Sequence, residues 1–291
     1  MANNTLTTLF RRSLITAGII TAAGCTTFSE GTSMTLTNTD KATALIESIE
    51  TGDHAPIAYI NADKYIQHNL AVADGLAGFG AVLKALPKGS AKAKVIRAFE
   101  DGNFAVTHTE YDFFGPKVGF DVFRFEEGKI VEHWDNLQEI APINASGRSQ
   151  LDGTTKMTDL AKTDQNKAIV EDFVQSILIN GEMKKIEQFI GPNEDDYLQH
   201  NPSVSDGLKG LGEALGALAE QGMPMIYEKN HIILGQGNFV LAISEGQFLN
   251  QHVAFYDLFR LDNSMIVEHW DTIEVIQEKD QWKNNNGKFA F

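Results

Sequence analysis

Cysteine is almost missing from this chain of 291 residues, because Cys25 is the only one. A single thiol cannot form an internal disulfide, and it cannot build the cysteine clusters that hold zinc. Basic residues are also scarce, since 24 Lys and Arg face 39 Asp and Glu and the formal net charge is −15. Nucleic-acid binding needs a basic face against phosphate, so this composition argues against that class of partner.

Several catalytic signatures are absent as well. The sequence contains no phosphate-binding glycine loop, no Rossmann glycine pattern and no Ser-His-Asp order. The apolar run near the N-terminus, residues 14–23, is too short to span a bilayer. Its length instead suits the core of a signal peptide, and a pair of arginines precedes it.

The only cysteine follows that apolar run directly after Ala-Ala-Gly, residues 22–24. Small residues before a cysteine resemble the lipobox of bacterial lipoproteins, in which the cysteine is lipidated. We therefore predict a signal peptide over residues 1–24, lipidation of Cys25, and an exported chain anchored on the periplasmic side of a bacterial membrane. The alternatives are a plain secretory signal, or a cytoplasmic protein translated from Met34.

What the chain does contain is a repeat. The hexapeptide IVEHWD occurs at residues 130–135 and 266–271, and a pentapeptide occurs as YIQHN at 65–69 and YLQHN at 197–201. The offset between matching segments grows from 132 to 136 residues, as small loop insertions would make it. Each unit has the size of a domain, which predicts a first domain at 39–140, a linker at 141–160 and a second domain at 161–280.

Each unit begins with helical spacing and ends with alternating spacing. In the first unit Ala42, Leu45, Ile46 and Ile49 mark a helix, and period-two segments bounded by glycine turns follow after residue 90. The second unit repeats this order. We therefore predict an α+β class of two tandem cone-shaped domains, each with helices packed on a curved antiparallel sheet.

The order of a helix, YxQHN, an amphipathic helix and then FDVFRFEEGKIVEHWDNLQ resembles the SnoaL-like polyketide cyclase family. That family belongs to the nuclear-transport-factor-2-like superfamily, and the resemblance covers both units. It implies the cone fold, which hosts cyclases, isomerases, dehydratases and binding proteins without catalysis. It also implies an acid/base role for the aspartate that ends HWD, here Asp135 and Asp271. The first unit departs from the family by having Leu70 where the second has Pro202.

The turn at residues 126–129 sets which side chains share a face of the sheet. A glycine bulge at Gly128 would pair Asp121 with His133 and would bring Asp135 to the same face. The same reading of the second unit groups three residues: Asp257, His269 and Asp271. Further candidates for lining a pocket are the tyrosines and histidines of the two pentapeptides and one histidine of the first unit alone: Tyr65, Tyr197, His68, His200 and His108.

A carboxyl group in an apolar pocket can move a proton at a carbon next to a carbonyl. We therefore expect a cofactor-independent enzyme that cyclises, isomerises or dehydrates a small apolar carbonyl compound, with no metal. Two alternatives stay open: a binding protein for an apolar small molecule, and an interaction scaffold. The aspartates would then only accept hydrogen bonds at strand ends, and the histidines would be core residues. The two units are further expected to form an internal pseudo-dimer, or the chain a homodimer.

Overall fold

The computed structural model describes residues 35–87 and 89–291, and residues 36–291 form one compact unit. The predicted signal peptide, Cys25 and Met34 lie outside the described residues, so export and the lipid anchor stay predictions. Within the described ranges, no helix combines the length and apolar character that a membrane crossing requires.

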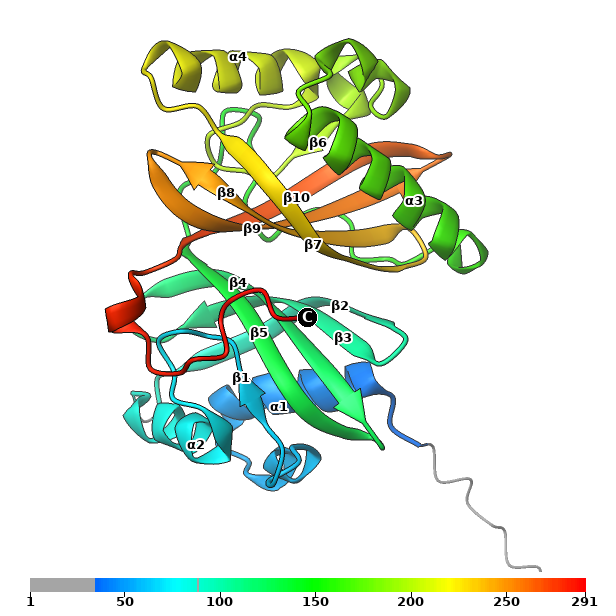
Figure 1. The fold of residues 1–291 in the computed structure, drawn as a ribbon. Helices are drawn as coiled ribbons and strands as arrows, with labels where there is room; N and C mark the ends of the chain where they lie inside the picture. The colour runs from blue at the N-terminus through cyan, green and yellow to red at the C-terminus, as the bar shows by residue number, and fades with distance from the viewer. Residues whose placement is uncertain (1–34, 88) are drawn as a thin grey trace, which may run out of the picture. The chain divides into compact units, whose positions relative to one another are not determined.

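The first copy of the repeat occupies residues 38–139 (Figure 1), and its described residues form two α-helices, a short 3-10 helix (Ala55–Tyr59) and five strands. Its first helix begins behind Thr37, whose side chain accepts the backbone amide of Asp40, while Asp40 accepts the amide of Thr37 in return. The bounds are α1 (Asn38–Thr51), β1 (Ile66–Gln67), α2 (Gly75–Ala85), β2 (Lys92–Asp101), β3 (Phe104–Asp112), β4 (Pro116–Glu126) and β5 (Lys129–Glu139).

The second copy occupies residues 163–275 and repeats this order. Its first helix continues into a π-helical segment, Val174–Ile179, which has no counterpart in α1. The bounds are α3 (Thr163–Phe173), β6 (Leu198–Gln199), α4 (Gly207–Glu220), β7 (Ile226–Gln236), β8 (Phe239–Phe248), β9 (Gln251–Asp262) and β10 (Met265–Val275).

Each copy has a five-stranded sheet, with strand orders β1-β5-β4-β3-β2 and β6-β10-β9-β8-β7. The four long strands are antiparallel, and the two-residue strands β1 and β6 run parallel to β5 and β10. The predicted α+β class with helices on a mostly antiparallel sheet is confirmed, and the short parallel strand makes each sheet mixed.

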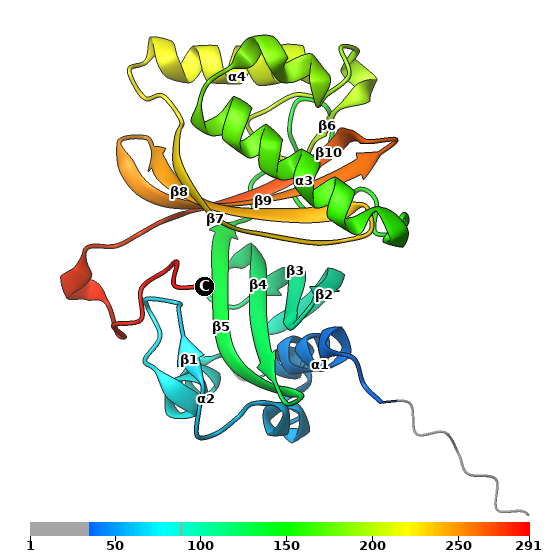
Figure 2. The ribbon, with the colours of Figure 1, turned by 45° about the vertical axis from the view of Figure 1, so that its right-hand side comes forward.

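The two faces of each sheet bury different neighbours. On one face, residues of both sheets form a single apolar core that includes Phe120, Trp134, Leu241, Tyr256 and Trp270. Figure 2 shows the helices on the opposite faces. Because side chains alternate along a strand, the buried residues of β4, β5, β9 and β10 alternate between the shared core and the helix-covered side.

The predicted bulge at Gly128 is wrong, although it grouped the right residues. Glu127 and Gly128 have φ values of 49° and 73°, which is a two-residue type I′ turn, and the register shifts further along, between Arg124 and Phe125. Asp121 therefore lies opposite Asp135 instead of His133. The two registers differ by two residues, so the same side chains still share a face.

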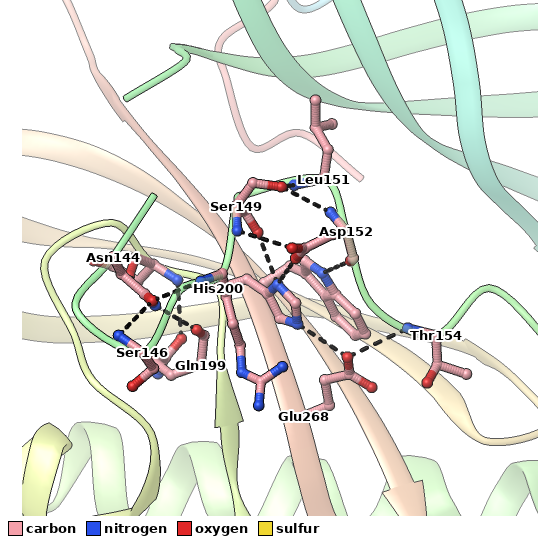
Figure 3. A network of polar contacts seen from close by, with 12 residues as sticks. Asn144, Ser146, Ser149, Leu151, Asp152, Thr154, Gln199, His200 and Glu268 are labelled. Atoms are coloured by element: carbon pink, nitrogen blue, oxygen red, sulfur yellow. Dashed lines mark hydrogen bonds and ion pairs between the residues drawn. The ribbon is translucent and has the colours of Figure 1, made fainter. Parts of the chain in front are cut away.

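The segment after each sheet crosses to the other copy. We call residues 140–154 the linker strap and residues 276–291 the C-terminal strap. The Asn144 amide of the linker strap donates to the carbonyls of Gln199, Asn201 and Val204 in the second copy, as Figure 3 shows in part. These bonds hold the linker strap on the second copy, at and just after the YLQHN segment.

The C-terminal strap makes the equivalent contacts with the first copy. Asn284 donates to the carbonyls of Asn69 and Val72 at 2.8 and 2.9 Å. Both straps share the pattern Asn-x-x-Gly followed by a basic residue, in which Gly147 and Gly287 have φ values of 79° and 77°. Each copy is thus held by the segment that follows the other copy.

Candidate functional site

The repeated pentapeptide places its side chains alternately on the two faces of the sheet. In the second copy, Tyr197, Gln199 and Asn201 turn towards the helix-covered side, and His200 between them turns towards the shared core. The first copy repeats this arrangement with Tyr65, Gln67, Asn69 and His68.

A chain of hydrogen bonds runs from this pentapeptide to the long strands. In the second copy, His269 contacts Gln199 Oε1 through Nδ1 at 2.9 Å and Asp257 Oδ1 through Nε2 at 3.0 Å. The Gln199 oxygen also accepts the backbone amide of Asn201, which fixes it as an acceptor. The first copy has the same chain at 3.1 and 3.0 Å, made by Gln67, His133 and Asp121.

This chain determines where protons lie. Since Gln199 Oε1 accepts, His269 Nδ1 must carry a proton, and a neutral imidazole has no second one. The contact between Nε2 and Asp257 needs a further proton, so His269 and Asp257 share it as an imidazolium–carboxylate pair or as imidazole with carboxylic acid. The pair carries no net charge in either form.

Asp271 lies directly opposite Asp257 in the sheet and ends the chain of polar groups. Its Oδ2 accepts the side-chain amide of Asn201 at 2.7 Å, and its Oδ1 is buried with no hydrogen-bond partner among the described residues. Burial raises the pKa of Asp271, the neighbouring His269 opposes this rise, and Asp257 adds to it. An unpartnered carboxylate oxygen of raised pKa is suited to accept a proton from a bound molecule.

A tyrosine hydroxyl completes the cluster in each copy, but from different strands. Tyr227 on β7 donates to Asp257 at 3.1 Å, and Tyr111 on β3 donates to Asp121 at 2.6 Å. In the sheet Tyr227 lies opposite Gly246, while Tyr111 lies opposite Ala93. The two tyrosines therefore come from non-equivalent strands, but their hydroxyls reach equivalent carboxylates. The internal repeat did not predict either tyrosine, because the matching position in the other copy holds a different residue.

A cavity of about 670 Å³ opens on this cluster in the second copy. Its walls are mainly apolar and come from α3, the π-helical segment, α4 and the inner face of β9 and β10. They include Phe173, Ile177, Leu178, Leu211, Leu215, Leu218, Val253, Phe259 and Ile273. The polar residues at its surface include those of the cluster: Tyr197, Gln199, Asn201, Tyr227, Asp257, His269 and Asp271. A volume of this size suits a small or medium organic molecule.

Tyr197 is the hydrogen-bond donor best placed for such a molecule. Its hydroxyl accepts the side-chain amide of Gln199 at 3.4 Å, and among the described residues no acceptor binds its own proton. Burial, with added repulsion from Asp257 and Asp271, raises the pKa of Tyr197. The phenol therefore stays protonated and can donate to a ligand oxygen.

The histidines of the pentapeptides lie away from the cavity. His200 contacts the carbonyl of Ser149 in the linker strap at 2.7 Å through Nδ1 and Glu268 at 2.9 Å through Nε2 (Figure 3). Its ring stacks on Trp270. His68 makes the same type of contacts with Gly287 and Glu132. The structure therefore does not bring these two histidines together with the aspartates.

His108 also lies on the side of the shared core. Its ring stacks on Phe120, and its Nδ1 lies 3.1 Å from the guanidinium of Arg97. Burial and the nearby Arg97 hold the pKa of His108 well below its usual value. The prediction that His108 lines a pocket with Asp121 is wrong, because His108 lies opposite Phe120 and is one residue out of phase with Thr107 and Asp121.

The cluster has the residue types of a metal site. One ligand atom each from Asp257, His269 and Asp271 lie within 4.8 Å of one another, as do those of Asp121, His133 and Asp135. Both nitrogens of His269 are already engaged, one of them by a group fixed as an acceptor. An ion would have to replace the proton shared with Asp257, so the donors as arranged favour proton chemistry over ion binding.

No protein-family model matches the chain, and no curated protein sequence matches it. Solved structures similar to it include an NTF-2-like protein from Burkholderia xenovorans, at 20% identity and a TM-score of 0.32, over 40% of this chain and 94% of that one. An NTF2-like protein from Cytophaga hutchinsonii matches at 14% identity and 0.32, over 36% and 94%. An LEH-like epoxide hydrolase from M. tuberculosis matches at 23% and 0.29, over 39% and 85%.

Helices and a five-stranded sheet of the expected order occur twice along the chain. The chain is a tandem of two copies of one α+β fold. Each of these similarities to a solved structure extends over about one copy of the repeat.

Proposed function

We propose that the second copy binds a small or medium apolar carbonyl compound and moves a proton on it with Asp271. The observation that supports this most directly is the free Oδ1 of Asp271, buried at the surface of a mainly apolar cavity of about 670 Å³. A hydrogen bond to Oδ1 as well would make Asp271 a weaker base, and a solvated carboxylate would have an ordinary pKa.

In the proposed step, Asp271 Oδ1 takes a proton from the carbon next to the carbonyl. The electron pair of the broken C–H bond moves to form the enolate, and its oxygen accepts a hydrogen bond from Tyr197. The protonated Asp271 then returns the proton to another carbon, which isomerises the compound. Alternatively, the enolate carbon attacks a second carbonyl, whose oxygen takes the proton from Asp271, and the compound is cyclised. In dehydration, the electron pair of the enolate expels the hydroxyl group of the neighbouring carbon, which leaves as water with the proton from Asp271.

The uncharged pair of His269 and Asp257 positions the site in this proposal. It places no net charge beside Asp271, and Gln199 connects it to Asn201, which holds the other oxygen of Asp271. The base therefore faces the ligand with one oxygen while the second is fixed.

The experiment is hydrogen–deuterium exchange on the apolar ketone 2-tetralone in deuterated water, followed by NMR. Asp271→Asn keeps the shape of the side chain and should slow exchange by about 10²–10⁴-fold, the usual contribution of a positioned acid or base. Asp135→Asn, the same change in the first copy, is the matched control and should leave the rate within about twofold of the parent.

A parent protein that binds the ketone without exchanging it would favour the second candidate, a binding protein for an apolar small molecule. The same conclusion holds if Asp271→Asn exchanges the ketone as fast as the parent. The observation behind this candidate is the apolar wall of the cavity, which supports binding whether or not chemistry follows.

A further inference from the structure

The two copies differ in the charges around their equivalent aspartates. In the second copy, the cavity surface near Asp271 includes Gln138, which comes from the end of β5 and accepts the backbone amide of Ile273. In the first copy, the residue in the equivalent place is Glu274 from the end of β10, which accepts the backbone amide of Leu137. A neutral amide in one copy thus corresponds to a carboxylate in the other.

The basic residues of the two straps also differ: only that of the C-terminal strap lies beside the aspartate of its site. Arg148 of the linker strap binds Asp206, with contacts of 2.9–3.0 Å. Lys288 of the C-terminal strap turns inward, and its ammonium binds Glu274 at 3.0 Å and lies 3.9 Å from Asp135 Oδ1. Within the part of the chain that the structure describes, this oxygen of Asp135 has no hydrogen-bond partner, like Oδ1 of Asp271.

The ammonium group of Lys288 is buried between two carboxylates. The side chain of Lys288 is 3% exposed, and that of Asp135 is 8% exposed. A buried lysine is costly unless carboxylates compensate its charge, and here two of them face it. Lys288 reaches them because Asn284 and Gly287 fix the C-terminal strap on Asn69 and His68.

We infer that the first copy contains a binding site for a primary ammonium group, formed by Asp135 and Glu274 and filled by the chain's own Lys288. The site takes a cation, whereas the compound that we propose for the second copy is neutral and apolar. This inference does not depend on the proposed proton transfer, since it concerns binding in the other copy.

The test removes the tethered cation and offers a free one. Lys288→Ala leaves a gap of about the length of an alkylamine. Thermal unfolding of the variant and of the parent is then measured with n-butylammonium chloride. The two controls are 1-butanol at the same concentration and sodium chloride at matched ionic strength. We expect the variant to unfold at a lower temperature than the parent. Butylammonium should then raise its midpoint with the logarithm of concentration and leave the parent unchanged, because a ligand of the native state stabilises it by mass action.

Three comparisons make the result specific. Arg148→Ala, the equivalent change in the other strap, should show no response to the amine, and butanol should not replace butylammonium in Lys288→Ala. The double variant Asp135→Asn/Lys288→Ala should lose most of the response. If Lys288→Ala does not fold alone, folding with the amine and not with the alcohol is the same positive result. An equal effect of butylammonium on the parent and on Lys288→Ala, or no effect on either, overturns the inference.

Discussion

Two aspartates at the ends of equivalent strands have different electrostatic surroundings. Asp135 has the ammonium of Lys288 within 3.9 Å, whereas the pKa of Asp271 is raised by burial and only partly lowered by His269. A raised folded-state pKa means that the native protein binds the proton more tightly than the unfolded chain. Stability is therefore lost as the pH rises above the unfolded pKa of about 4 and through the folded value.

Asp271→Asn removes this cost and should stabilise the protein at pH 7 by about 0.5–2 kcal/mol, the range usual for a stabilising substitution. The gain should shrink as the pH falls towards about 4, where the parent carboxyl is also neutral. Asp135→Asn should have the opposite sign at pH 7, because it leaves Lys288 with one carboxylate instead of two. Urea unfolding at several pH values measures both, and a pH-independent effect of Asp271→Asn would contradict the assignment.

The turns between β4 and β5 and between β9 and β10 have the same backbone geometry but different sequences. Glu127-Gly128 and Asn263-Ser264 both adopt positive φ at the two central positions, with 73° at Gly128 and 65° at Ser264. Glycine adopts that conformation freely, and an L-residue pays for the contact of its Cβ with the backbone.

Ser264→Gly should therefore stabilise the second copy by about 0.5–1 kcal/mol, and Gly128→Ser should destabilise the first by about 1 kcal/mol or more. The pair serves as its own control because the two turns have the same length and φ signs. Chemical denaturation of both variants gives the values. Shifts of the same sign would show that contacts outside the backbone decide the turn.

Elements whose periodicity is strong were predictable from the sequence. Alternation along β4 and β5 placed Asp121, His133 and Asp135 on one face even though the turn was assigned wrongly, because the error preserved the phase. The same alternation applied to the pentapeptides would have placed His68 and His200 on the other face, next to Trp134 and Trp270.

Other parts of the site carried a weaker signal or none. Tyr111 and Tyr227 reach the carboxylates from different strands, so the internal repeat has no tyrosine in common at either position. The straps were detectable as Asn-x-x-Gly plus a basic residue at a spacing of 140, but nothing in a short polar pattern says that it crosses to the other copy. The depth of the cavity depends on helix packing, which the sequence pattern does not fix.

On the scale of the whole molecule, the shared core and the crossing straps join the two copies. Asn284 follows the second copy in sequence and holds the first, while Asn144 does the reverse. Each buried amide satisfies backbone carbonyls that would otherwise lose a partner, which costs about 1–3 kcal/mol.

Asn284→Ala should therefore speed amide hydrogen exchange around residues 65–72 of the first copy, far from it in sequence. Asn144→Ala should do the same around residues 197–204 of the second copy. Exchange measured by mass spectrometry resolves these segments. In each variant, the pentapeptide that the altered strap does not contact is the internal reference. Faster exchange confined to the copy that precedes the altered strap would contradict the crossing.

The placement of Lys288 and Glu274 in only one of the two sites has a consequence for how such a protein can evolve. In a symmetric dimer of a single-copy chain, any substitution appears in both sites at once, so a cation introduced into one would also enter the other. A tandem chain removes this constraint, because each position is encoded twice and can change independently. Duplication thus allows one half to acquire a built-in charge while the other half keeps a neutral apolar chamber, within one molecule whose halves cannot separate.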